Sequence, residues 1–126
     1  MTVRDKTAPK AGKVLIVNSD PEITRILEVN LIHANFEVLL AHNGAEALQI
    51  TRRDKADIII LDQDLPDAEN PEICQKIKEL YASMPIIIIG SGSKKGNVAL
   101  KPEEIGVIYI TKPFNPREVV AIVQGY

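Results

Sequence analysis

The residues of this chain best suited to chemistry stand directly after short apolar runs. Asp62 follows Ile58-Ile59-Ile60-Leu61, and Lys112 follows a second such run near the C-terminus. A carboxylate can attack a phosphoryl group only if the negative charge on that group is neutralised, and a lysine ammonium can do this. At about 4 Å and an effective dielectric near 20, the two side chains would also attract each other by roughly 4 kcal/mol before desolvation is subtracted. The pair therefore indicates either phosphoryl chemistry or a direct ion pair.

These two residues meet only if the apolar runs form one sheet. From Lys13 onward, short runs rich in Ile and Val alternate with longer segments of helical periodicity, which is typical of a parallel sheet. Five strand and helix units with right-handed crossovers give an open, doubly wound sheet, whose ligands collect at the C-terminal ends of the strands. The expected strands are 14–17, 36–41, 58–61, 86–89 and 107–110, which places Asn18, Asp62, Gly90 and Lys112 at such ends.

The segments between the strands carry start signals for helices. A capping residue followed by proline specifies the first helix, and a capping residue with its reciprocal acid marks the last. The fourth segment differs because glycine, serine and lysine dominate it and Pro102 interrupts it, so only one or two short turns are expected. The expected helices begin at Asp20-Pro21, Asn43, Pro71 and Asn115-Pro116, the last with Glu118 as the acid.

Composition limits the class of protein. The chain has 126 residues, 45% of them hydrophobic, with a formal net charge of −2 and a single cysteine. This is the balance of one folded domain of ordinary size, with Cys74 expected as a packed thiol. Because there is no excess of Lys and Arg to hold a phosphate backbone, nucleic acid is not expected as a direct ligand. No apolar run is long enough to cross a bilayer, so we expect no membrane partner. We expect a cytoplasmic location.

Four stretches of the chain resemble the receiver domains of two-component response regulators. They are KVLIVNSDPEI at 13–23, ADIIILDQDLP at 56–66, MP at 84–85 and YITKPF at 109–114. The resemblance implies a (βα)5 flavodoxin-like receiver fold over residues 13–126, after a flexible leader at 1–12. It also implies that Asp62 accepts a phosphoryl group from a histidine kinase, that Lys112 pairs with the phosphate, and that the Lys112–Pro113 peptide bond is cis. The chain would then be a signalling module and not an enzyme.

The residues at the metal site of the family are changed here. Receiver domains hold magnesium with an acidic pair that closes the first strand, and in this chain the pair is Asn18 and Ser19. Magnesium prefers hard, anionic oxygen ligands, so the loss of both acids puts metal binding in question. Asp20 is either a shifted ligand or a helix N-cap, and Asp64 either borders the site or is a solvated loop acid. These four residues are the candidate magnesium ligands.

The switch residues are changed as well. In the family, a Thr or Ser hydroxyl at the end of the fourth strand moves toward the phosphate, and the residue at that position is Gly90. Ser91 comes one residue late, so its side chain points to the opposite face unless the neighbouring glycines bend the loop back. The aromatic partner is present as Tyr109, three residues before Lys112. It is either a moving switch or a static, half-buried side chain.

Two alternative functions stay open on these residues. A direct ion pair between Asp62 and Lys112 could fix the pocket in one state, which would make the domain a pseudo-receiver that binds proteins independently of phosphorylation. Asp62-Gln63-Asp64 also resembles the Asp-x-Asp pair of haloacid dehalogenase-like phosphatases, although the later strand ends lack the further acids of that motif. The expected partners are a histidine kinase or another signalling protein, with an output domain or effector protein outside this chain.

Overall fold

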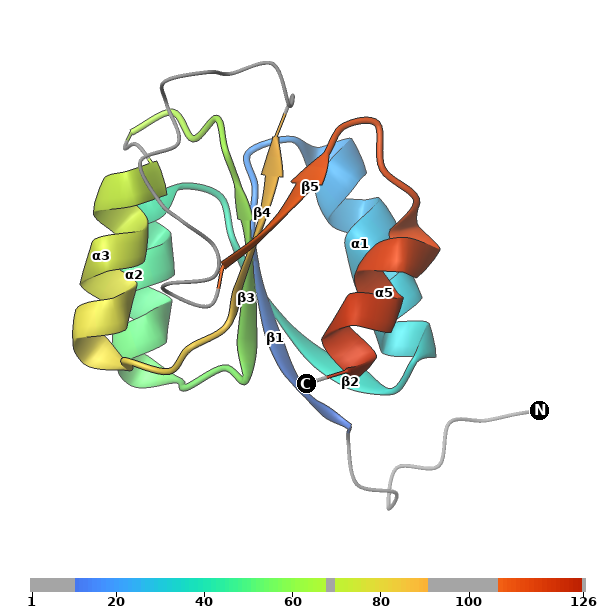
Figure 1. Ribbon diagram of the computed structural model, residues 1–126, viewed down its shortest axis with the longest axis horizontal. Helices are drawn as coiled ribbons and strands as arrows, with labels where there is room; N and C mark the ends of the chain where they lie inside the picture. Colours follow the sequence, from blue (N-terminus) through green and yellow to red (C-terminus); the bar gives the residue numbers. More distant parts are fainter. Residues whose placement is uncertain (1–10, 68–69, 91–106, 126) are drawn as a thin grey trace.

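Five strands form one parallel sheet at the centre of the computed structural model, which describes residues 11–67, 70–90 and 107–125 (Figure 1). The strand order across the sheet is β2-β1-β3-β4-β5, which confirms the doubly wound arrangement. Most of the leader predicted at 1–12 and the short turns predicted around Pro102 lie outside the described residues. The strands are β1 (Gly12–Val17), β2 (Phe36–Ala41), β3 (Ile58–Asp62), β4 (Ile86–Gly90) and β5 (Val107–Thr111).

Isoleucine and valine dominate the central strands because helices cover both faces of the sheet. All residues of β3 and of β4 are buried, so these strands are continuous apolar runs in which no solvent-facing residue alternates. Beta-branched side chains also favour the extended backbone. At the edge of the sheet, β5 keeps Ile108 and Tyr109 partly exposed and Thr111 exposed. The sequence signal is therefore strongest where the strand is most central.

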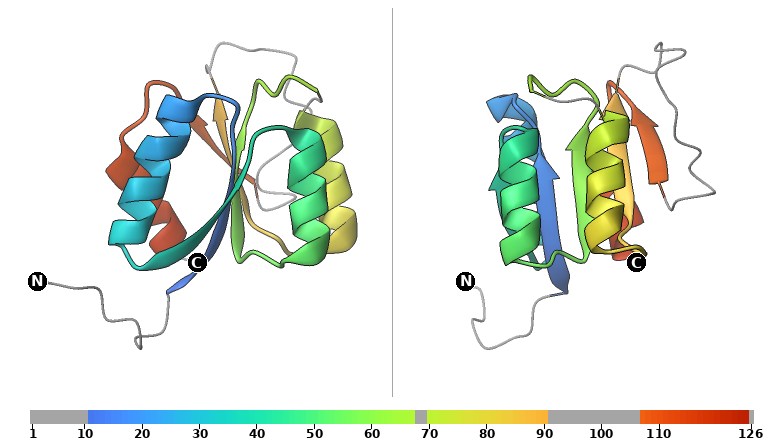
Figure 2. Two further views of the ribbon diagram at one scale, coloured as in Figure 1. Left: turned by 180° about the vertical axis from the view of Figure 1, so that it is seen from behind. Right: turned by 90° about the vertical axis from the view of Figure 1, so that its left-hand side faces the viewer.

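In the described part of the chain, four helices pack in two pairs on the faces of the sheet. One face is covered by α1 (Pro21–His33) and α5 (Pro116–Gln124), and the other by α2 (Gly44–Arg53) and α3 (Asn70–Leu80) (Figures 1 and 2). Within the described residues, no helix is long and apolar enough to span a membrane. Each pair closes one apolar core, the first with Leu27, Leu31, Val119 and Val123 and the second with Ala47, Ile73, Cys74 and Ile77.

The predicted caps start the first and last helices. Asp20 Oδ1 accepts a hydrogen bond from the backbone N–H of Glu22 at 2.9 Å, and Asn115 Oδ1 accepts one from Arg117 at 2.9 Å. A capping box would instead join the Asn115 side chain to the N–H of Glu118, and that N–H donates to the Asn115 carbonyl oxygen. Asn115 is thus confirmed as the capping residue, but its side chain bonds to the N–H of Arg117, one residue before the predicted Glu118.

The single cysteine is a core residue. Cys74 is fully buried in the core beneath α2 and α3. Burial penalises the thiolate and raises the pKa of the Cys74 thiol to about 12. The interpretation of Cys74 as a packed thiol is confirmed.

Candidate functional site

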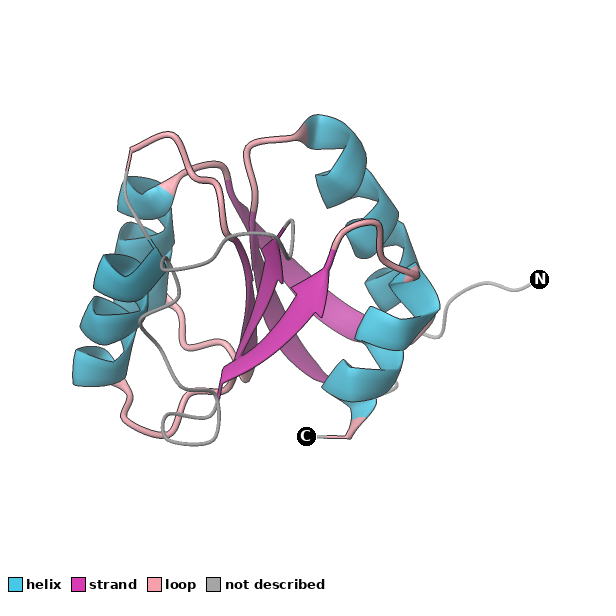
Figure 3. Cartoon of the chain, turned by 45° about the horizontal axis from the view of Figure 1, so that its top comes forward, coloured by secondary structure: helices cyan, strands magenta, loops and turns pink. Residues whose placement is uncertain are grey.

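Asp62 and Lys112 meet at the edge of the sheet where the strands end, the edge that Figure 3 turns toward the viewer. The Lys112 Nζ lies 3.2 Å from Asp62 Oδ1, so the direct ion pair that the sequence allowed is present. The contact crosses the end of β4, because β3 and β5 are separated by that strand. The Asp62 side chain is 5% exposed and the Lys112 side chain 29%. A carboxylate this buried requires a charged or hydrogen-bonding partner, and Lys112 supplies one.

The backbone around both residues fixes their positions. The N–H of Asp64 donates to Asp62 Oδ1 at 3.3 Å, so the loop after β3 turns back over the carboxylate. The N–H of Lys112 donates to the Gly90 carbonyl oxygen at 2.6 Å, which continues the pairing of β5 with β4 past the end of the strand. The Lys112–Pro113 peptide bond is cis, as the resemblance implied. Asp62 and Lys112 are therefore placed by sheet hydrogen bonds and by one short loop.

The neutral residues at the end of β1 form a turn closed on itself. Asn18 is buried, and its Oδ1 accepts a hydrogen bond from the N–H of Asp20 at 2.8 Å. Ser19 and Asp20 are exposed, and the Asp20 carboxylate caps α1. Of the two interpretations of Asp20, the helix N-cap is the one that the hydrogen bonds support. Of the two residues that replace the acidic pair, Asn18 is thus engaged with the start of α1 through its side chain.

These side chains do not fit a resident magnesium ion. Within residues 11–67, 70–90 and 107–125, no three His, Cys, Asp or Glu side chains come together in a way that could hold a metal. Asp62 is the buried carboxylate at this edge, Asp64 is exposed, and the Asn18 oxygen is neutral and already accepts a hydrogen bond. Magnesium demands near-octahedral oxygen ligands and is usually anchored by carboxylates. The described residues supply one buried carboxylate, Asp62, at the centre of the site, where a cluster of carboxylates would be needed.

The switch positions hold a contact that the sequence did not predict. Gly90 is the buried last residue of β4, and the half-buried Tyr109 donates its hydroxyl hydrogen to Gln63 Oε1 at 2.5 Å. Both of these side chains lie over Gly90. In the sequence, Gly90 signals that a neighbour fills the space over it, because a close-packed interior leaves few voids, but it does not show that the neighbour is Gln63. Ser91, the other predicted switch residue, lies outside the described residues.

A second unpredicted contact joins the loop after β3 to α2. Asp67 Oδ1 accepts a hydrogen bond from the N–H of Gly44 at 2.7 Å, and its Oδ2 accepts one from Ala45 at 3.0 Å. These backbone hydrogen bonds at a helix N-terminus favour the carboxylate and lower the pKa of Asp67. Asn43 caps the same helix, because its Oδ1 accepts a hydrogen bond from the backbone N–H of Glu46. The loop that carries Asp64 is thereby tied to a helix from another part of the sequence.

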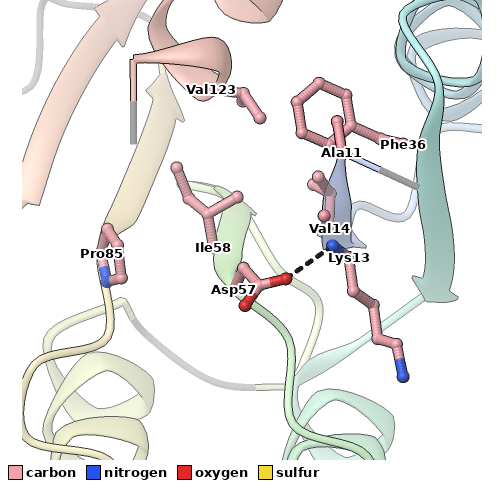
Figure 4. A pocket seen from close by; sticks show the side chains of 9 residues that line it. Ala11, Lys13, Val14, Phe36, Asp57, Ile58, Pro85 and Val123 are labelled. Atoms are coloured by element: carbon pink, nitrogen blue, oxygen red, sulfur yellow. Dashed lines mark hydrogen bonds between the residues drawn. The ribbon is translucent and has the colours of Figure 1, made fainter. Parts of the chain in front are cut away.

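A separate pocket lies at the opposite edge of the sheet, where β1, β3 and β4 begin (Figure 4). It has a volume of about 370 Å³, and apolar side chains such as Phe36, Ile58 and Val123 form much of its wall. Asp57 also faces it, but the Asp57 carboxylate accepts a hydrogen bond from the Lys13 backbone N–H at 2.8 Å. That carboxylate therefore stabilises the start of β1.

Similarity to known proteins extends over almost the whole chain. A family model described as response regulator receiver domain matches residues 14–124. The alkaline phosphatase synthesis transcriptional regulatory protein PhoP of Bacillus subtilis (strain 168) is 33% identical over 113 residues, which cover 90% of this chain and 47% of PhoP. The chain thus spans about half the length of that curated relative.

Solved structures give the same result. A CheY-like response regulator receiver domain protein from Methanospirillum hungatei JF-1 is 26% identical with a TM-score of 0.82, and the match covers 90% of each chain. A putative response regulator from Chloroflexus aurantiacus J-10-fl is 31% identical with a TM-score of 0.77, covering 90% of this chain and 95% of that one. These similarities give no support to the haloacid dehalogenase alternative.

Proposed function

Since the chain belongs to the response regulator receiver domain family, we propose that Asp62 is its phosphoacceptor in two-component phosphorelay signalling. Receiver domains are in general signalling modules and not enzymes. The observation that carries the proposal is the position of Asp62, a buried carboxylate at the C-terminal end of β3 with the Lys112 ammonium 3.2 Å away. Nucleophile and cation come from separate strands and meet where an open α/β sheet binds its ligands.

The proposed reaction is a direct phosphoryl transfer. An Asp62 carboxylate oxygen forms a bond to phosphorus while the bond from phosphorus to the donor breaks, and the donor's leaving atom keeps the electron pair. Lys112 then exchanges its contact with the carboxylate for one with a phosphoryl oxygen. Its side chain is more exposed than that of Asp62 and flexible along its stem, so it can follow the new charge.

Receiver domains generally bind Mg²⁺ for this reaction. The described residues of this chain do not supply the usual donor set, so we assign the neutralising charge to Lys112. This assignment makes the Asp62 and Lys112 pair the minimal phosphorylation site of the chain.

The proposed phosphoryl donor is a histidine kinase, and the proposed recipient of the signal is an output domain or an effector protein. Receiver domains interact with both kinds of partner. The relative PhoP is a transcriptional regulatory protein, so control of transcription is one form that such an output takes in this family. A histidine kinase as donor also supports a cytoplasmic location.

The test is chemical modification of the purified chain. Incubation with acetyl phosphate at high magnesium should add one phosphoryl group by intact mass, and beryllofluoride at high magnesium should shift the amide resonances around Asp62. Asp62→Asn should abolish the change, while Glu79→Gln, which alters an exposed acid on α3, should retain it. An unchanged mass and an unchanged spectrum at high magnesium would contradict the proposal and favour a phosphorylation-independent interaction module.

A further inference from the structure

Two side chains occupy the space above Gly90, one from Gln63 directly after β3 and one from Tyr109 in β5. A Cβ atom added at Gly90 would come within 3.0 Å of Gln63 Oε1 and of the Tyr109 hydroxyl oxygen, closer than real Cβ atoms approach. A side chain at this position would therefore displace both groups. Gly90 belongs to a regular strand, so the glycine is explained here by close approach of neighbouring side chains.

The sheet brings the two side chains to the same face. The N–H of Gln63 donates to the Ile89 carbonyl oxygen at 2.8 Å, which sets the residue after Asp62 beside the end of β4. Tyr109 pairs in register with Ile88 and packs against the core beneath α2 and α3. Because side chains alternate between the faces of a strand, Gly90 shares its face with Ile88. Glutamine and tyrosine thus meet over the one residue that has no side chain to separate them.

We propose that Gln63 is a positioning residue whose carboxamide holds Tyr109 turned inward over Gly90. The carboxamide takes the place of the Thr or Ser hydroxyl that the family carries at the end of β4. The hydrogen bond between Tyr109 and Gln63 Oε1 joins β5 directly to the residue that follows Asp62. A displacement of the loop after β3 therefore reaches Tyr109 through one side-chain contact. The orientation of Tyr109 is independent of phosphorylation in this scheme, whereas its use as a signal rests on the proposed function of Asp62.

The proposal predicts which chemical feature of residue 63 matters. The Tyr109 hydroxyl needs an acceptor oxygen at the position of Gln63 Oε1. Gln63→Glu keeps such an oxygen, and Gln63→Leu keeps a comparable volume without one. A residue that merely filled space would tolerate leucine, while a hydrogen-bonding partner would tolerate only glutamate.

The experiment measures the orientation of the Tyr109 ring in the full 126-residue chain by NMR. The wild type should show nuclear Overhauser contacts from the Tyr109 ring to Gly90 Hα and to the Gln63 side chain. Gln63→Leu should lose the contact to Gly90, and Gln63→Glu should retain it. Tyr81 is the internal reference, since its hydroxyl donates to the Thr51 carbonyl oxygen at 3.4 Å, away from this contact. An unchanged Tyr109 contact in Gln63→Leu would overturn the proposal.

A second variant approaches the same contact from β4. Gly90→Ala adds the one atom that the two side chains exclude, so the Tyr109 contacts to residues 63 and 90 should weaken together. If the alanine variant kept both contacts unchanged, the assigned role of the space over Gly90 would be wrong.

Repeating the measurements with beryllofluoride separates this proposal from the assignment of Asp62. Release of Tyr109 in Gln63→Leu without any beryllofluoride response in the wild type supports the positioning role of Gln63 and counts against Asp62 as the phosphoacceptor. A beryllofluoride response combined with an unchanged Tyr109 in Gln63→Leu supports Asp62 and overturns the role of Gln63.

Discussion

The ends of β3 and β5 carry Asp62 and Lys112, which match the family, whereas the end of β1 carries Asn18 and Ser19 in place of its acidic pair. The two regions are held by different kinds of contact. Asp62 and Lys112 depend on each other across β4, although they lie far apart in the sequence. At the end of β1, the side chains of Asn18 and Asp20 accept hydrogen bonds from backbone N–H groups only two residues away. The charged pair is thus a long-range contact, whereas the changed residues form a local turn. The comparison indicates that the turn can be altered without disturbing the pair.

Removing the cation should have the largest effect on stability. Lys112→Met leaves the carboxylate of Asp62 buried without its charged partner, and we expect the free energy of unfolding to fall by about 2 kcal/mol, less than the ~3–5 kcal/mol for a fully buried pair because Lys112 is partly exposed. Chemical denaturation followed by circular dichroism measures this loss.

The matched control is Lys13→Met, because Lys13 also makes an ion pair of 3.2 Å, with Asp54. The two lysines are 27% and 29% exposed, but Asp54 is 42% exposed where Asp62 is 5% exposed. We therefore expect a much smaller loss from Lys13→Met. Equal losses in the two variants would show that burial of the acid does not distinguish the pairs.

Filling the space over Gly90 should cost almost as much. Gly90→Thr forces Gln63 and Tyr109 apart, and overpacking of this kind costs about 1–3 kcal/mol. Gly125→Ala is the control, since a Cβ there would approach the Ile122 carbonyl oxygen no closer than 3.4 Å, an ordinary van der Waals contact. Thermal unfolding of the two variants checks the contrast, and a threonine variant as stable as the wild type would contradict it.

Restoring the acids at the end of β1 should raise the affinity for magnesium and leave the fold intact. Asn18→Asp keeps the oxygen that accepts from the Asp20 N–H, and Ser19 is exposed, so the double variant should fold. We expect magnesium affinity to rise by on the order of tenfold or more, since changes outside the first shell of ligands alone shift metal affinity by ~10–100-fold. Calorimetric titration measures the gain, with Ser83→Asp as a control on an exposed turn. No gain would mean that residues 18 and 19 do not face the metal position.

The smallest expected effect is a pH dependence at Asp67. Its native pKa lies below the ordinary 3.8, so its contribution to stability is fully present above that value and is lost as the pH falls through the native pKa. The difference in unfolding free energy between wild type and Asp67→Asn should be constant near neutrality and shrink below about pH 4. Glu79→Gln on the exposed side of α3 is the control. A difference that stays constant down to the acid transition would contradict this account.

Local patterns predicted most of the fold. The runs of isoleucine gave β3 and β4 because burial on both faces leaves a continuous apolar signal, and Asp20 and Asn115 marked helix starts because capping is a short-range hydrogen bond. The Asp62 and Lys112 pair was also predictable, since parallel strands bring their C-terminal ends to one edge.

The contacts of Gln63 and Asp67 could not be predicted in this way. Each joins a loop residue to a group far along the chain, and neither residue type by itself marks a partner. The Gln63 contact also requires that Gly90 has no side chain. A comparison with the family motif shows only that the Thr or Ser hydroxyl is missing at this position. The replacement becomes visible only when the neighbours of the empty position are known.

The central place of β3 has a consequence for hydrogen exchange. This strand is paired on both sides, with β1 and with β4, and all of its residues are buried. Each of its amides faces β1 or β4 and none faces an open edge, so they should be among the slowest to exchange in the described part of the domain, while those of the edge strand β5 should exchange earlier. We therefore expect Asp62 to lie in a part of the sheet that opens slowly, and Tyr109, on the edge strand, to lie in one that opens sooner.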